Sequence, residues 1–90
     1  MSDITFSFIG TGNMGGALAR AARRRLPAGE ILLSNRTQAR AEALAGELGC
    51  AAGTVLQAAE RGRYLFLGVK PQMMAGLLAE LAPVLARRED

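Results

Sequence analysis

The segment Phe8–Gly16, which reads FIGTGNMGG, constrains the fold of this 90-residue chain more than any other part of the sequence. Its spacing G-x-G-x-x-G is weak evidence by itself, because glycine is common and the chain contains 11 glycines. The flanking sequence adds weight, since residues 5–9 predict a strand and the apolar spacing after the glycines predicts a helix. A glycine-rich turn that joins a strand to a helix is typical of a βαβ unit that binds a dinucleotide.

The three spaced glycines have separate roles in that interpretation. Gly10 permits the tight turn, Gly12 lets the backbone approach a pyrophosphate, and Gly15 lets the helix pack closely on the strand. The helix N-terminus adds free N–H groups and a partial positive charge for the phosphates. The alternative is a turn whose glycines serve backbone geometry alone, and the surrounding pattern favours the dinucleotide site.

The rest of the chain continues the alternation of strands and helices. Further strands are predicted at residues 31–34, 50–52 and 64–69, and a helix follows each of them. The last strand, YLFLGV, is apolar throughout, as expected when helices cover both faces of a sheet. The order βαβαβαβα predicts an α/β fold, a Rossmann-like doubly wound parallel sheet with strand order 3-2-1-4.

Helical spacing predicts the buried face of each long helix. The predicted faces are Met14, Ala17, Leu18 and Ala21 in the first helix, Ala41, Leu44, Ala45 and Leu48 in the second, and Met74, Leu77, Leu78, Leu81 and Leu85 in the last. We expect Thr37 and Gly49 to begin and end the second helix, and Gly62 to close a short helix at residues 55–61. Pro83 is expected to interrupt or kink the last helix.

Composition argues against several kinds of site. With one cysteine and no histidine, the chain can form neither an internal disulfide nor a Cys/His metal cluster, and we expect no metal. No segment approaches the ~20 consecutive apolar residues of a membrane span, and no signal peptide is recognisable, so a cytoplasmic protein is expected. The net charge of +3 comes from scattered arginines without interleaved aromatics, and we expect no binding to nucleic acid.

The residues after the second predicted strand bear on the choice of cofactor. NAD sites usually place an Asp or Glu there, about 20 residues past the glycines, to hold the ribose 2′-hydroxyl. Here Asn35 takes the acidic position and Arg36 follows it. An arginine can pair with a 2′-phosphate and stack on adenine, and Thr37 can add a hydroxyl, so the segment favours NADP over NAD. The alternative is that Arg36 is a solvated loop residue.

The segment Gly68-Val69-Lys70-Pro71 follows the fourth predicted strand, which lies beside the first strand in the expected order. Doubly wound sheets bind ligands in the crevice at this point of the topology. We therefore expect the segment to flank the cofactor between its phosphates and its nicotinamide. Lys70 is either a cation near the cofactor or a solvated lysine, and the sequence leaves both open. Pro71 is expected to set the start of the helix.

Together, the segments FIGTGNMGG, SNRT and FLGVKPQMM resemble pyrroline-5-carboxylate reductase, and the resemblance covers essentially the whole chain. It implies an oxidoreductase that makes proline by hydride transfer from NAD(P)H to a cyclic imine. The cofactor-binding residues that it implies are Gly10, Thr11, Gly12, Asn13, Met14 and Gly15 at the pyrophosphate, Asn35, Arg36 and Thr37 at the 2′-phosphate ribose, and Gly68, Val69, Lys70 and Pro71 toward the nicotinamide. We can name no catalytic residue.

The sequence also departs from that family. The family's sheet continues with a fifth strand, and a helical substrate and dimerisation domain follows; these 90 residues stop before both. Where members usually carry an Asn before the third helix, this chain has GTVLQ, and Arg63 replaces an acidic residue that many of them have. We therefore expect residues 1–90 to be the dinucleotide-binding domain, inactive alone. The alternatives are the cofactor half of another NADP-dependent reductase, or a non-catalytic nucleotide-binding module.

Without a fifth strand, Tyr64–Val69 lies at an edge of the predicted sheet. This stretch contains no Lys, Pro or bulge that would protect the edge, and an apolar edge strand invites pairing with another chain. We expect the chain to self-associate through this strand.

Overall fold

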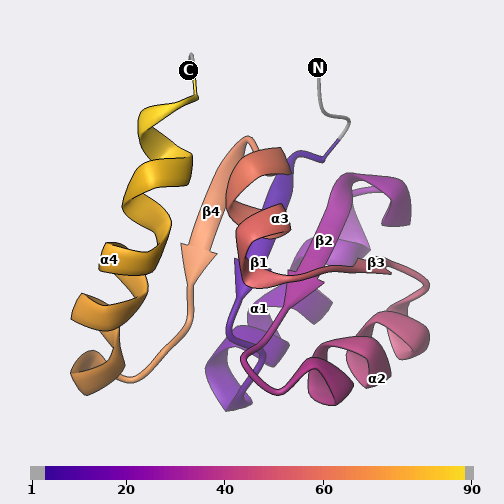
Figure 1. Cartoon of the computed structure of the whole chain (residues 1–90). Helices are drawn as coiled ribbons and strands as arrows, with labels where there is room; N and C mark the ends of the chain where they lie inside the picture. Colours follow the sequence, from indigo (N-terminus) through magenta and orange to yellow (C-terminus); the bar gives the residue numbers. More distant parts are fainter. Residues whose placement is uncertain (1–3, 89–90) are drawn as a thin grey trace.

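The computed structural model describes residues 4–88 as parallel strands and α-helices in alternation (Figure 1). The elements are β1 (Phe6–Ile9), α1 (Asn13–Arg25), a 3₁₀ turn η1 (Ala28–Glu30), β2 (Ile31–Ser34), α2 (Gln38–Leu48), β3 (Ala51–Ala52), α3 (Val55–Arg61), β4 (Tyr64–Leu67) and α4 (Pro71–Ala86). The sheet has the order β3-β2-β1-β4, so the predicted fold class and strand order are confirmed. Three strands are shorter than predicted, since Thr5 lies outside β1, Cys50 lies outside β3, and Gly68 and Val69 lie outside β4.

Strand β1 is the centre of the sheet. Its four residues pair in parallel with Ile31–Ser34 of β2 on one side and with Tyr64–Leu67 of β4 on the other. β3 adds one short pairing, to Leu32 and Leu33 of β2. Because all pairs are parallel, the carboxyl ends of β1, β2 and β4 lie along one edge, where doubly wound sheets bind ligands.

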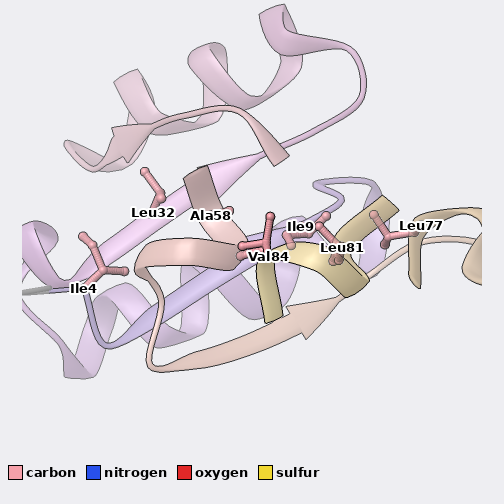
Figure 2. Packing of buried hydrophobic residues seen from close by; sticks show 8 residues of the cluster. Ile4, Ile9, Leu32, Ala58, Leu77, Leu81 and Val84 are labelled. Atoms are coloured by element: carbon pink, nitrogen blue, oxygen red, sulfur yellow. The ribbon is translucent and has the colours of Figure 1, made fainter. Parts of the chain in front are cut away.

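The sheet is buried between two layers of helices. Alternation along β1 sends Phe8 to the face covered by α1 and α2, and Ile9 to the face covered by α3 and α4 (Figure 1). The apolar side chains between the sheet and α3 and α4 form one buried cluster. Figure 2 shows this cluster, in which Leu81 and Val84 of α4 lie close to Ile9 and to Ala58 of α3. Helices therefore cover both faces of the sheet, as the continuous apolar sequence of the last strand predicts.

The buried face predicted for α1 is wrong. Ala17, Leu18 and Ala21 are exposed, Leu18 to 41%, whereas Gly15, Gly16 and Ala19 are buried. The reason is a close contact between helix and turn, because a Cβ on Gly15 would collide with the carbonyl oxygen of Gly10. That contact fixes the rotation of the helix and outweighs the burial of one leucine. The side chain of Met14, predicted on the same face, lies outside the described residues.

In α4 the predicted stripe is partly wrong. Leu77 and Leu81 are buried as predicted, but Val84 completes the buried face, while Leu78 and Leu85 are exposed. The helix also continues through Pro83 to Ala86, so Pro83 does not interrupt it. A proline removes one backbone hydrogen bond, and here it does so in the last turns, which burial of Leu81 and Val84 holds in place.

The ends of the shorter helices follow the sequence closely. α2 begins after Thr37 and ends at Gly49, whose φ of 75° is left-handed. The side chain of Thr37 makes no capping hydrogen bond, however. In α3, Thr54 and Gln57 form a reciprocal capping box, and Gly62 follows the helix as predicted.

None of the helices between residues 4 and 88 combines the length and the apolar character needed to cross a membrane. Over the same range, no three His, Cys, Asp or Glu side chains lie close enough together to hold a metal ion.

Leu81→Ala is expected to lower the free energy of unfolding by about 2–5 kcal/mol, because the leucine is fully buried between α4 and the sheet. The matched variant Leu78→Ala, on the same helix but 44% exposed, should change it by less than about 1 kcal/mol. Urea unfolding followed by circular dichroism measures both. Equal losses would contradict the orientation of α4 described above.

Candidate functional site

Three glycines meet where the turn after β1 contacts the turn after β4. A Cβ on Gly10, whose φ is +98°, would lie 2.5 Å from the carbonyl oxygen of Gly68. A Cβ on Gly68 would lie 3.1 Å from the carbonyl oxygen of Gly10, and one on Gly15 would collide with that same oxygen. Packing within the protein therefore accounts for these three glycines.

Gly12 is different. Its backbone angles, φ −73° and ψ −161°, suit any residue, and no atom beyond its chain neighbours lies within 4 Å of the place a Cβ would take. Gly12 is exposed and stands at the N-cap of α1, where it can make no side-chain capping bond. The fold does not require a glycine here, but a ligand that approaches the backbone at the helix N-terminus does.

The loop between β2 and α2 touches the glycine turn. The backbone N–H of Gly10 donates to the carbonyl of Ser34 at 2.9 Å, and that of Thr11 donates to Oδ1 of Asn35 at 3.3 Å. Nδ2 of Asn35 in turn donates to the carbonyl of Thr37 at 3.2 Å. Asn35 is half-buried, whereas Arg36 and Thr37 are exposed. Two of the three predicted segments are thus in direct contact.

The third predicted segment joins them from the other side. The backbone N–H of Gly68 donates to the carbonyl of Ile9 at 2.8 Å, which places the turn before α4 against the end of β1. Val69 is half-buried against the cluster below α4, and Lys70 is exposed at the N-cap of that helix. Pro71 is the first helical residue, as predicted. The backbone of all three segments meets at the carboxyl edge of the sheet.

A shallow depression lies between α1 and α2, beside the glycine turn. Its lining residues are Thr11, Gly16, Arg20, Arg40, Ala43, Leu44 and Glu47. The guanidinium of Arg20 donates twice to the carboxylate of Glu47, at 2.9 and 3.2 Å, and these hydrogen bonds lower the pKa of Glu47. Arg40 forms no ion pair with any residue between 4 and 88, so its charge is available at this rim.

A second depression lies on the other side of the β2–α2 loop. Its lining residues are Asn35, Arg36, Gln38, Thr54, Val55, Leu56 and Glu80. Thr54 and Val55 stand where the sequence lacks the Asn of the resembling family. Arg36 and Arg40 therefore flank the β2–α2 loop, one at each depression. Sequence reasoning missed Arg40, although its position four residues after Arg36 places both near the first turn of α2.

Thr11 carries a buried hydroxyl without a hydrogen-bond partner among the described residues. Buried polar groups are nearly always paired, so an orphaned hydroxyl in a glycine turn fits a place built for a polar ligand. Ser7 and Ser34 have similar orphaned hydroxyls, but both lie within the sheet. The oxygen of Ser7 occupies the space that a side chain at Gly62 would fill.

The ionisable side chains described at this edge are suited to holding anions. Arg36, Arg40 and Lys70 are exposed cations, and Glu80 is the acidic group that lines a depression without an ion pair in the described region. The thiol of Cys50 is half-buried after α2, and burial raises its pKa, which makes it a weak nucleophile at neutral pH. The arrangement supports ligand binding and supplies no acid–base pair.

Comparisons with known proteins bear on the family and the fold of the chain. Residues 5–89 match the model of the family described as NADP oxidoreductase, coenzyme F420-dependent. In structure, the chain is similar to a pyrroline-5-carboxylate reductase from Coxiella burnetii, with a TM-score of 0.84 and 21% identity over 97% of this chain and 33% of that one. It is also similar to glutamyl-tRNA reductase from Methanopyrus kandleri, with a TM-score of 0.64 and 23% identity over 100% of this chain and 23% of that one.

At these identities the structural likeness concerns the fold, and the chain spans a third or less of the length of either reductase. No curated protein matches the sequence significantly. The resemblance to pyrroline-5-carboxylate reductase that the sequence suggests is confirmed at the level of the domain by the family model and the structural match.

Substitution by serine distinguishes Gly12, which the fold does not require, from Gly15, which packs against the turn. Gly12→Ser should leave the free energy of unfolding within about 0.5 kcal/mol of its original value, because there is room for the side chain and serine is a good N-cap. Gly15→Ser should lower it by about 2 kcal/mol or more, because its Cβ would collide with the carbonyl of Gly10. Thermal and urea unfolding measure both, and a strongly destabilised Gly12→Ser protein would show that the fold itself needs that glycine.

Proposed function

This chain belongs to the family described as NADP oxidoreductase, coenzyme F420-dependent, and from that premise we propose that it is the NADP-binding domain of a pyrroline-5-carboxylate reductase. The observation that carries the proposal is Gly12, a glycine that the fold does not require, at the exposed N-terminus of a 13-residue helix. A cytoplasmic location, expected from the sequence, stays a prediction.

In this proposal the turn Gly10–Gly15 holds the pyrophosphate. Backbone N–H groups in the first turn of α1 have no side-chain cap and no acidic residue beside them, so they are left to a bound anion. The helix dipole adds a partial positive charge at the same point. The orphaned hydroxyl of Thr11 supplies a further polar group within the turn.

The adenosine end of the cofactor is assigned to the β2–α2 loop. Arg36 and Arg40 are cations without ion pairs in the described region, so a 2′-phosphate at this loop would meet an available positive charge at either depression. Arg20 is already paired with Glu47, which leaves Arg40 as the available charge in the first depression. The absence of a carboxylate at Asn35 removes the usual partner of an unphosphorylated ribose. These residues favour NADP over NAD.

The nicotinamide end is assigned to Gly68–Pro71, which lies against the glycine turn. Bound NADPH supplies a hydride, which in a pyrroline-5-carboxylate reductase reduces the imine bond of the substrate. The residues of this chain bind and orient that cofactor: Gly68 allows close approach to Gly10, and Lys70 places a positive charge at the start of α4. The proposal assigns no proton transfer to these residues.

A second candidate is the cofactor-binding domain of another NADP-linked reductase. The family description names coenzyme F420 and no imine substrate, and the similarity to glutamyl-tRNA reductase extends over the whole of this chain. Assays of a full-length enzyme that contains this domain, with pyrroline-5-carboxylate against other carbonyl and imine substrates, separate the two. Either candidate requires the same dinucleotide site.

We expect the chain to bind NADPH more tightly than NADH, with an advantage of about tenfold or more that Arg36→Ala removes. Calorimetry or nicotinamide fluorescence measures both affinities. Arg24→Ala is the matched control, because this exposed arginine lies at the far end of α1, away from the carboxyl edge. Gly12→Ser should weaken both nucleotides alike, since its side chain would fill the space at the pyrophosphate.

An unchanged preference in Arg36→Ala would remove the 2′-phosphate assignment. Equal binding of both nucleotides by the original chain would do the same. Full binding by a folded Gly12→Ser protein would contradict the pyrophosphate site, and with it the proposed function.

We further propose that the chain self-associates through β4. This strand pairs with β1 alone among the described strands, and Tyr64 is more than half exposed at its start. An unprotected apolar edge strand is a template for another chain.

Light scattering over a concentration series should therefore show dimers or larger species, and Tyr64→Lys, which puts a charge on the edge, should shift the distribution toward monomer. A monomer at every concentration would contradict this proposal and leave the cofactor site untouched.

A further inference from the structure

Asn35 has its side-chain amide engaged on both sides within the protein. Its Oδ1 accepts the backbone N–H of Thr11 in the glycine turn at 3.3 Å, and its Nδ2 donates to the carbonyl of Thr37 at 3.2 Å. The carbonyl of Thr37 also accepts the backbone N–H of Arg40 in the first turn of α2 at 3.0 Å. One side chain thus connects the turn at the N-terminus of α1 with the start of α2.

The two hydrogen bonds suit an amide at this position. The N–H of Thr11 needs an acceptor and the carbonyl of Thr37 needs a donor, and the amide of Asn35 offers the two from separate atoms. An Asp could accept from Thr11, but its carboxylate would face the carbonyl of Thr37 with no proton to donate. The residue that would hold an unphosphorylated ribose is therefore the residue that would break this bridge.

From this bridge we propose that Asn35 is a positioning residue for the cofactor site: it fixes the glycine turn through Thr11 and holds the loop that carries Arg36 through Thr37. The proposal rests on the proposed function, and it gives Asn35 a role different from direct contact with the 2′-phosphate. The amide selects NADP in two ways, because it keeps a carboxylate away from the phosphate and keeps the loop of Arg36 in place for it.

The two hydrogen bonds of Asn35 are expected to affect nucleotide affinity separately. The bond to Thr11 acts on the pyrophosphate turn, so its loss weakens NADH and NADPH equally. The bond to Thr37 acts on the loop of Arg36, so its loss weakens NADPH alone, and only while Arg36 is present. A single neutral hydrogen bond contributes modestly, so we expect each effect to be about fivefold.

The first test uses the free chain and needs no cofactor. Amide hydrogen exchange by NMR should show the Thr11 N–H protected in the original chain, exchanging about fivefold faster or more in Asn35→Ala, and again protected in Asn35→Asp, whose carboxylate can still accept the bond. If the Thr11 N–H exchanges at the same rate in Asn35→Ala as in the original chain, the bridge is wrong. Circular dichroism confirms that the variants are folded, and Asn35→Leu, which has a similar shape but no acceptor, replaces Asn35→Ala if that variant does not fold.

The second test measures affinities for NADH and NADPH in Asn35→Ala, Arg36→Ala and the double variant. Asn35→Ala should weaken NADH about fivefold and NADPH about 25-fold, and the extra NADPH factor should vanish in the Arg36→Ala background. Asn35→Asp should retain the original affinity for NADH. An NADPH-specific loss of the same size in the Arg36→Ala background means that Asn35 contacts the phosphate directly, which overturns the positioning role.

The two tests separate this inference from the proposed function. If the original chain binds neither nucleotide, the proposed function fails and the role of Asn35 toward a cofactor fails with it. If both nucleotides bind and Thr11 exchange is insensitive to residue 35, the function stands and the bridge is wrong.

Discussion

The packing of Gly10 against Gly15 and Gly68 is the contact on which the rest of the structure depends. No side chain fits between these three backbones, so α1 and the turn before α4 both lie against the end of β1. This contact sets the rotation of α1 and exposes Leu18 at the surface. It also leaves the N-terminus of α1 uncapped and open at the carboxyl edge of the sheet. The same contact therefore shapes the core and presents the candidate binding site.

Near that contact, positive charge is gathered at the β2–α2 loop. The cations Arg36 and Arg40 lie at the β2–α2 loop. Arg20 is also near, but its charge is already paired with Glu47. Asn35 links this loop to the glycine turn through its side-chain amide. An anion at the N-terminus of α1 and a second anion near the loop would thus meet groups that are already connected. A dinucleotide with a 2′-phosphate carries two such anionic groups, its pyrophosphate and its 2′-phosphate.

Much of the fold could be predicted from the sequence, because local signals agree with the global order. The apolar runs predicted the strands, Gly49 and Gly62 predicted the helix ends, and the order of the elements predicted a parallel sheet with its strand order. The faces of α1 and α4 could not be predicted from apolar spacing, since a backbone contact at Gly15 and burial of Val84 decided them. In the site, the residues after each strand were identifiable by position. The bridge made by Asn35 was not, because it depends on two turns 24 residues apart meeting in space.

If the carboxyl edge of this sheet binds a 2′-phosphorylated dinucleotide, the backbone amides along that edge must respond to it. The most direct measurement is an NMR titration of the ¹⁵N-labelled chain with NADP⁺, followed through the backbone amides. Shift changes are expected to concentrate at residues 10–16, 35–40, 54–56 and 68–71, with the helix ends at the opposite edge unaffected. Saturating NADP⁺ that leaves the amides of residues 10–16 unchanged would contradict it.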